Sequence, residues 1–319
     1  MRLTILGNGF DKAHGLPTGL TKFRDFLREY YDYEEINDFD PTFTAPQETT
    51  ILGGDFGVPQ EEVARFMDYL VSSSDAEDDK DSLWAKLENT LGKLNPGIFL
   101  DDATEDYDNE GDYDYRRNYS NIENIASGFL PSLIEFSGLF NNWIDSIQLT
   151  DVECQPEFYN LLKKFEPCLS FNYTLTAEEL YGVENITHIH GICGDRKLML
   201  GHAPCDRIES SNSIYEDAVG YTLDRFHKYL EKDTEEIIGN HSDFFCKDNL
   251  SEISEVYTYG FSYSTADIPY MKEIIRQIPS NAGWFIHNFK EEEANVHKKI
   301  LEDLGFSGEI HFYKKQDLE

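Results

Sequence analysis

A glycine-rich loop follows the first apolar run of the chain. Leu3 to Leu6 leads into Gly7-Asn8-Gly9-Phe10-Asp11 and then into Gly15-Leu16-Pro17-Thr18. Glycines let a backbone turn sharply and approach a phosphate closely, and the N-terminus of a following helix favours negative charge. The third glycine comes later than in the Gly-x-Gly-x-x-Gly dinucleotide fingerprint. The loop therefore indicates a nucleotide site, while a helix cap explains Asp11 equally well.

Two polar residues follow other short apolar runs, in the same way as the glycine loop. Asn172 comes after Cys168 to Phe171, and His190 ends the run from Ile186 and is followed by Gly191. A histidine titrates near neutral pH and suits a general base. Each residue also has a plain structural explanation, since the histidine could satisfy a backbone carbonyl and the asparagine could cap a helix.

A metal site is a further alternative. His188 and His190 are expected to project from one face of a strand, and three more residues with ligating side chains follow in sequence, namely Cys193, His202 and Cys205. Histidine nitrogen and cysteine sulfur are common zinc ligands. Most clusters of this kind in a sequence are accidental, so we expect no bound metal.

Both ends of the chain alternate between strands and helices. Strands are expected at 3–6, 168–171, 186–190, 198–200, 256–259, 284–287 and 310–313, with helices at 268–278 and 291–304. Such alternation is typical of a mostly parallel sheet with helices on its faces. We therefore expect a Rossmann-like α/β fold.

The region 30–160 has a different pattern and is expected to be a helical insertion. Apolar residues at helical spacing occur at Phe66, Met67 and Leu70, at Leu83, Leu87, Leu91 and Leu94, and along a stripe from Ile122 to Ile147. Pro131 should kink the stripe. The acidic tracts 75–81 and 101–114 are expected to be solvated loops. The second echoes half of an EF-hand, but Arg117 stands where a bidentate glutamate is required.

Composition excludes several classes of protein. The 27 Lys and Arg against 61 Asp and Glu give a formal net charge of −34, which repels nucleic acid and anionic lipid. No apolar run approaches the roughly 20 residues of a membrane-spanning helix, and we expect no signal peptide. The five cysteines are widely spaced with no Cys-x-x-Cys pair, which disfavours a disulfide framework or zinc ribbon. We expect a cytoplasmic protein.

Taken together, the motifs resemble those of the sirtuin-like superfamily and, within it, the AbiH family of bacterial phage-resistance proteins. The resemblance rests on the opening loop, on Phe171-Asn172-Tyr173-Thr174, on Ile189-His190-Gly191, on Leu200-Gly201-His202 and on the later Gly260-Phe261-Ser262 turn. It implies that residues 1–319 form one sirtuin-like α/β domain. It also implies a phage-defence protein that binds NAD or a related nucleotide and hydrolyses its nicotinamide–ribose bond.

The resemblance also implies roles for individual residues. His190 would be the base, and Asn172 would orient the ribose or the attacking water. Gly7, Asn8 and Gly9 would line the pyrophosphate, and Ser262 the adenosine side. The other expected cofactor-binding residues are Asp11, Gly15, Pro17, Thr18, Gly260 and Asp267.

Two departures and two alternatives accompany this hypothesis. The chain lacks the four-cysteine zinc module of sirtuin deacylases, which argues against deacylation, and Thr174 stands where the sirtuin Asn motif has an acidic residue. The alternatives are a non-catalytic nucleotide sensor that acts through a partner, and a metal-dependent hydrolase or nuclease that uses His188, His190 and His202.

Expected partners are a nucleotide, a phage or host trigger protein and further copies of the chain. An active NAD hydrolase would harm its host, so we expect a silent resting state regulated by the insertion.

Overall fold

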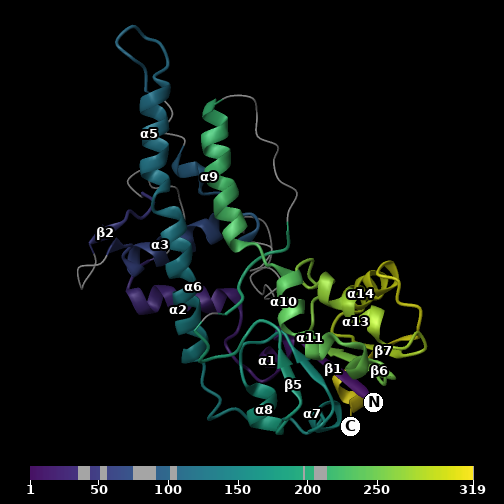
Figure 1. Cartoon of the computed structure of the whole chain (residues 1–319). Helices are drawn as coiled ribbons and strands as arrows, with labels where there is room; N and C mark the ends of the chain where they lie inside the picture. Colours follow the sequence, from purple (N-terminus) through teal and green to yellow (C-terminus); the bar gives the residue numbers. More distant parts are fainter. Residues whose placement is uncertain are drawn as a thin grey trace.

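A parallel sheet forms the centre of the part that contains both ends of the chain (Figure 1). The computed structural model describes residues 1–34, 44–50, 56–74, 91–100, 106–196, 198–204 and 214–318. Within these residues the sheet has the order β5-β4-β1-β6-β7-β8, and every pair is parallel. The strands are β1 (Arg2–Leu6), β4 (Cys168–Ser170), β5 (Ile186–His188), β6 (Glu255–Tyr259), β7 (Gly283–His287) and β8 (Ile310–Tyr313). The predicted parallel α/β fold is confirmed.

The strand order reverses beside β1. The chain proceeds from β1 outward through β4 and β5, and then returns to the other side of β1 to add β6, β7 and β8. This is the order of doubly wound dinucleotide-binding folds, in which the reversal point opens a crevice at the carboxyl ends of the strands. Any site formed by the loops after β1 and β6 therefore lies at the reversal.

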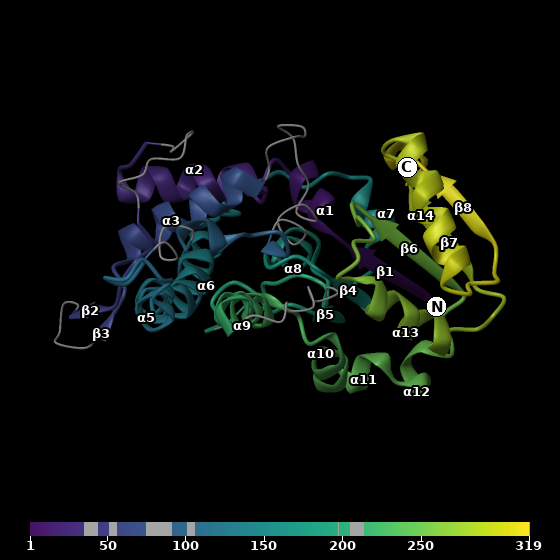
Figure 2. The same ribbon diagram turned by 90° about the horizontal axis from the view of Figure 1, so that it is seen from above.

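Alternating side chains of the strands build a core on each face of the sheet. Leu3 and Ile5 of β1 face one core, and Leu6 faces the other. The first core is covered by α10 (Thr234–Asn240), α11 (Ser242–Phe245), α12 (Lys247–Leu250), α13 (Ile268–Gln277) and α14 (Glu291–Asp303). The second core contains residues of α1 (Asn8–Ala13), α7 (Phe158–Leu161), α8 (Thr176–Tyr181) and η3 (Lys315–Leu318). Figure 2 shows α10, α11 and α12 together along one side.

A separate helical part extends away from the sheet (Figure 1). It contains α2 (Leu20–Tyr31), α3 (Gln60–Ser74), η1 (Pro96–Phe99), α5 (Tyr115–Ala126), α6 (Phe129–Ser146), α9 (Ile214–Leu230) and the short strands β2 (Thr49–Thr50) and β3 (Phe56–Gly57). Its core is rich in aromatic side chains. Asp68 of α3 is buried between Arg24 and Arg28 of α2, at 2.6 and 2.8 Å. The predicted insertion 30–160 covers most of these helices, whereas α2 begins earlier and α9 lies beyond it.

Pro131 does not kink one long helix. The apolar stripe is divided into α5, which ends at Ala126, and α6, which begins at Phe129. Pro131 lies in the first turn of α6, where a missing backbone N–H breaks no helical hydrogen bond. Gly128 lies between the two helices, and its backbone packs so closely on the carbonyl of Pro46 that a Cβ would not fit.

One expected strand is corrected, and several other expected features lie outside the described residues. The run 198–200 is not a strand, because it forms a loop in which the Met199 N–H donates to the carbonyl of His190, and Leu198 packs into the helical core. Leu83, Leu87, the tract 75–81 and residues 101–105 lie outside the described residues. None of the described helices is long and apolar enough to cross a membrane.

Candidate functional site

The glycine loop after β1 packs directly on the loop after β6. The N–H of Gly7 donates to the carbonyl of Tyr259 at 3.0 Å, and the N–H of Gly9 donates to that of Gly260 at 2.9 Å. A Cβ on Gly9 would lie 2.5 Å from the Cα of Gly260, which itself has a φ of +59°. The close approach of two backbones thus explains these glycines without a ligand. Their contact with a phosphate stays a prediction.

The Gly-Leu-Pro-Thr segment folds back onto the start of α1. The Asn8 side chain donates to the carbonyl of Thr18 at 2.8 Å and accepts from the Thr18 hydroxyl at 2.5 Å. Gly15 provides the turn after α1 with a φ of +77°, and Pro17 lies between this turn and Thr18. Asn8 therefore fixes the shape of the loop beside the strand ends.

Asn172 joins three of the strand ends. Its side-chain amide donates to the carbonyl of Gly7 at 3.1 Å, and its backbone carbonyl accepts from Nδ1 of His188 at 2.8 Å. Its own N–H donates to the hydroxyl of Ser170 at 3.2 Å. The structure thus brings together Asn172 and the glycine loop, which are far apart in the sequence, at the carboxyl ends of β1, β4 and β5.

Asp11 is a buried carboxylate beside Asn172. Its two oxygens accept hydrogen bonds from the hydroxyls of Thr174 and Thr176, at 2.7 and 2.8 Å. Burial raises the pKa of Asp11 from 3.8 to about 6, although these hydrogen bonds and the charge of His188 act to lower it. Thr174 stands where the sirtuin motif has an acidic residue. A carboxylate does lie next to Thr174, but it belongs to Asp11 of α1.

His188 and His190 do not share a face, contrary to expectation. The strand β5 ends at His188, and His190 lies in the turn that follows. His188 donates from Nδ1 to the carbonyl of Asn172, and its Nε2 lies 2.7 Å from the carboxylate of Glu178 on α8. Glu178 and His188 together hold the Asn172 loop in place.

His190 is buried against aromatic rings and a lysine. The ring centroids of Phe171 and Tyr270 lie 5.4 and 5.8 Å from that of His190. The Nζ of Lys232, a residue only 4% exposed, donates to Nε2 of His190 at 3.2 Å. Burial and the charge of Lys232 lower the pKa of His190 well below its usual value. His190 is thus a neutral ring, and accepting this hydrogen bond puts its proton on Nδ1.

The space beside Asn8, Asp11 and Asn172 is small. A hollow of about 10 Å³ is lined by Asn8, Asp11, Thr18, Ile144, Phe171, Asn172, Tyr173 and Thr174. It has room for about one water molecule. This hollow is too small to hold a nucleotide.

The remaining predicted site residues, Ser262 and Asp267, lie between β6 and α13. Asp267 precedes this helix, and its carboxylate accepts from the hydroxyl of Ser264 at 2.9 Å. Ser262 follows the Gly260 turn and is half-buried. Glu178, Thr176 and Lys232 also contact residues of the candidate site and were not predicted, because each lies outside any recognisable motif.

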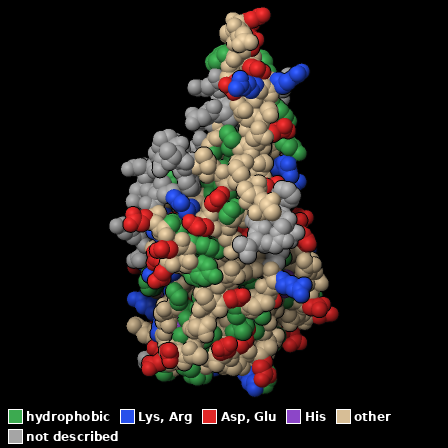
Figure 3. Space-filling model, turned by 90° about the vertical axis from the view of Figure 1, so that its left-hand side faces the viewer, with side chains coloured by type: hydrophobic (Ala, Val, Ile, Leu, Met, Phe, Trp, Pro, Cys, Tyr) green, Lys and Arg blue, Asp and Glu red, His purple; other side chains and the backbone are tan. Residues whose placement is uncertain are grey.

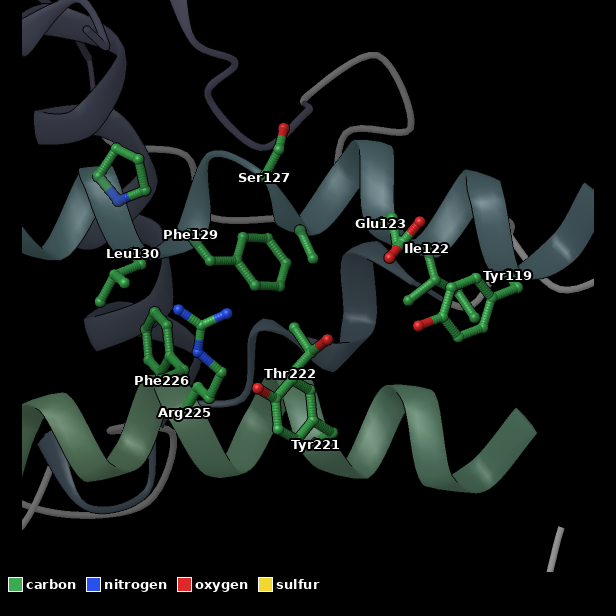
Figure 4. Close-up of a pocket in the computed structure, with 12 residues that line it drawn as sticks. Tyr119, Ile122, Glu123, Ser127, Phe129, Leu130, Tyr221, Thr222, Arg225 and Phe226 are labelled. Atoms are coloured by element: carbon green, nitrogen blue, oxygen red, sulfur yellow. The ribbon is translucent and has the colours of Figure 1, made fainter. Parts of the chain in front are cut away.

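A larger cavity lies in the helical part (Figure 4). It has a volume of about 550 Å³ and lies between α5 and α6 on one side and α9 on the other. In Figure 4 the guanidinium of Arg225 points into the cavity between Phe129 and Phe226.

Asp and Glu side chains are spread along the face shown in Figure 3, in keeping with the net charge of −34.

No group of three or more His, Cys, Asp or Glu side chains in the described part of the chain could hold a metal ion. His190 bonds to Lys232 instead, and His202 donates from Nδ1 to the carbonyl of Ala203. Cys205, which was part of the suggested cluster, lies outside the described residues.

Strand order and site together define a doubly wound parallel α/β protein with a buried polar cluster where the order reverses. Residues 3–288 match the protein family described as "Bacteriophage abortive infection AbiH". The chain belongs to this family. No curated protein and no solved structure matches the chain.

Proposed function

We propose that this AbiH protein binds NAD or a related nucleotide over the carboxyl ends of β1, β4 and β6 and hydrolyses its nicotinamide–ribose bond during phage defence. The observation that carries the proposal is the bond from Asn172 to Gly7, whose loop lies where the strand order reverses between β1 and β6. In open parallel sheets, ligands bind in the crevice at this point. The resemblance to sirtuin-like proteins supplies the identity of the nucleotide.

The reaction requires little covalent chemistry from the protein. Water forms a bond to C1′ of the ribose, the bond from C1′ to the nicotinamide nitrogen breaks, and a base takes one proton from the water. Nicotinamide leaves as a neutral molecule, and the ribose passes through a cationic, oxocarbenium-like state. The protein has to hold the nucleotide, orient the water and accept the proton.

The charges near Asn172 suit a cationic transition state. The carboxyl group of Asp11 accepts a hydrogen bond from Thr174, two residues after Asn172. The carboxyl group of Glu178 bonds to His188, which in turn bonds to the backbone carbonyl of Asn172. His190 is the proposed base, because its neutral ring is the form that accepts a proton. Asn172 is the proposed orienting group, since its amide already lies at the junction of the loops.

A non-catalytic nucleotide sensor is the second candidate. Two observations favour it: the hollow has room for about one water molecule, and the Nε2 atom of His190 already bonds to Lys232. A sensor would bind nucleotide with the same loops and respond by moving them, without breaking a bond.

Nicotinamide release after phage infection, by wild-type protein and by a His190→Ala variant, separates the two candidates. Loss of a general base lowers the rate about 10²–10⁴-fold, and nucleotide affinity should change little. His311→Ala is the matched control, because His311 is an exposed histidine on the edge strand β8. His188 is unsuitable as a control because it holds the Asn172 loop. Nucleotide binding without release in any of the proteins would favour the sensor.

A further inference from the structure

Lys232 is a buried cation that contacts the proposed base. Its side chain donates to Nε2 of His190 at 3.2 Å, and both residues are less than 5% exposed. The chemistry of the proposed reaction makes this contact inhibitory in two ways. The hydrogen bond covers the lone pair that would take the proton, and an ammonium group at this position repels a cationic transition state.

The backbone around Lys232 is held by the Leu200-Gly201-His202 segment. The N–H of Lys232 donates to the carbonyl of His202 at 2.9 Å, and the N–H of His202 donates to that of Leu230 at 2.8 Å. A Cβ on Gly201 would lie 2.3 Å from the Leu230 carbonyl oxygen. This segment therefore packs tightly against the end of α9 and fixes the position of the Lys232 backbone.

We propose that Lys232 is a positioning residue that acts through His190, and that the Leu-Gly-His segment exists to hold it there. Lys232 keeps the ring neutral with its proton on Nδ1 and blocks Nε2, so His190 works as a base only after Lys232 withdraws. The proposal rests on the proposed function. It also links the helical part to the site, because α9 ends two residues before Lys232 and forms one wall of the 550 Å³ cavity.

The first test follows the titration of His190 by NMR and needs no enzyme activity. Lys232→Met removes the charge but keeps much of the length, and Lys232→Arg keeps the charge. Lys232 and His241 are the described groups whose charges lower the His190 pKa, and Phe171, Tyr173 and Tyr270 supply its aromatic surroundings. The His190 pKa should rise by about one unit or more in Lys232→Met and stay low in Lys232→Arg. An unchanged titration in Lys232→Met would overturn the proposal.

The second test measures nicotinamide release from NAD without any trigger. We expect Lys232→Met to release nicotinamide at least about 10-fold faster than wild type, because an unblocked base contributes a factor of this order or more. Gly201→Ala should act in the same direction by displacing the end of α9. Lys228→Met is the matched control, since Lys228 is exposed on the last turn of α9, and Lys232→Arg should stay silent.

The outcomes separate this inference from the proposed function. A Lys232→Met variant slower than an active wild type would overturn the inference, because Lys232 would then assist the reaction. If no protein releases nicotinamide, even after phage infection, the proposed hydrolysis is wrong. The titration still decides in that case whether Lys232 sets the state of His190.

Discussion

The carboxylate of Asp11 lies 2.7 Å from the hydroxyl of Thr174, although the two residues are 163 positions apart in the chain. The contact links α1 to the loop after β4, and Thr176 reinforces it from the start of α8. Asn172 lies between these residues and bonds to the carbonyl of Gly7. The two loops most important to the candidate site are therefore joined by buried polar bonds.

The stability of the protein should depend on the protonation of Asp11. Its pKa is raised from 3.8 to about 6 in the folded state, so the folded state binds a proton that the unfolded state releases. This contribution is complete below the unfolded pKa and is lost as the pH rises through 6. Between pH 5 and pH 7.5 the free energy of unfolding should fall by about 1.4 kcal/mol from this group.

Urea unfolding of wild type and Asp11→Asn at the two pH values measures that difference. The asparagine variant cannot titrate at this position. Between pH 5 and pH 7.5 its free energy of unfolding should therefore fall by about 1.4 kcal/mol less than that of wild type. Equal changes in both proteins would show that Asp11 does not titrate in this range.

The glycine contact between the loops should tolerate no side chain. Gly9→Ala places a Cβ 2.5 Å from the Cα of Gly260, so one loop must shift, and we expect a loss of about 3 kcal/mol. Gly138→Ala is the matched control, because Gly138 lies inside α6 and a Cβ there meets none of the described atoms within 4 Å. The control should gain about 0.5–1 kcal/mol. Thermal or urea unfolding gives both values, and a harmless Gly9→Ala would contradict the observed contact.

Much of the fold was predictable because its signals are local. The strand β8 occurs at the predicted residues, and β6, β7, α13 and α14 differ from prediction by one residue at an end. Each combines an apolar run with a clear stop, such as Pro279 or Gly305. The run 198–200 was wrongly expected to be a strand, because Leu198 and Leu200 are apolar for a different reason: they pack on the helical core. Three residues are also too few to show a periodicity.

The candidate site was predictable only in part. Gly7, Asn172 and Gly260 follow three strands, and strand adjacency in a parallel sheet brings such residues together. Glu178 lies in a polar helix and Lys232 in a charged segment between α9 and α10, so nothing local marks them as partners of His188 and His190. The contact between glycines could not be foreseen either, because it depends on how closely two loops approach.

Asn8 and Thr18 should act as one unit. They exchange two hydrogen bonds that fix the loop after α1. Asn8→Ala should weaken nucleotide binding more than it lowers the rate, since it alters the shape of the binding loop and leaves the proposed base intact. Thr18→Val should have a similar effect, and combining the two should cost less than their sum by about 1 kcal/mol. Calorimetric titration with NAD measures the affinities, and strict additivity would show that the pair does not cooperate.

The proposed activity is tested most directly by whether the nicotinamide–ribose bond of NAD is broken. The decisive measurement is nicotinamide release in phage-infected cells that carry wild type, His190→Ala or His311→Ala. We predict release and loss of NAD with wild type and His311→Ala, and intact NAD with His190→Ala. If His190→Ala protects against phage as well as wild type while NAD stays intact in both, hydrolysis is contradicted and the nucleotide sensor is the better explanation.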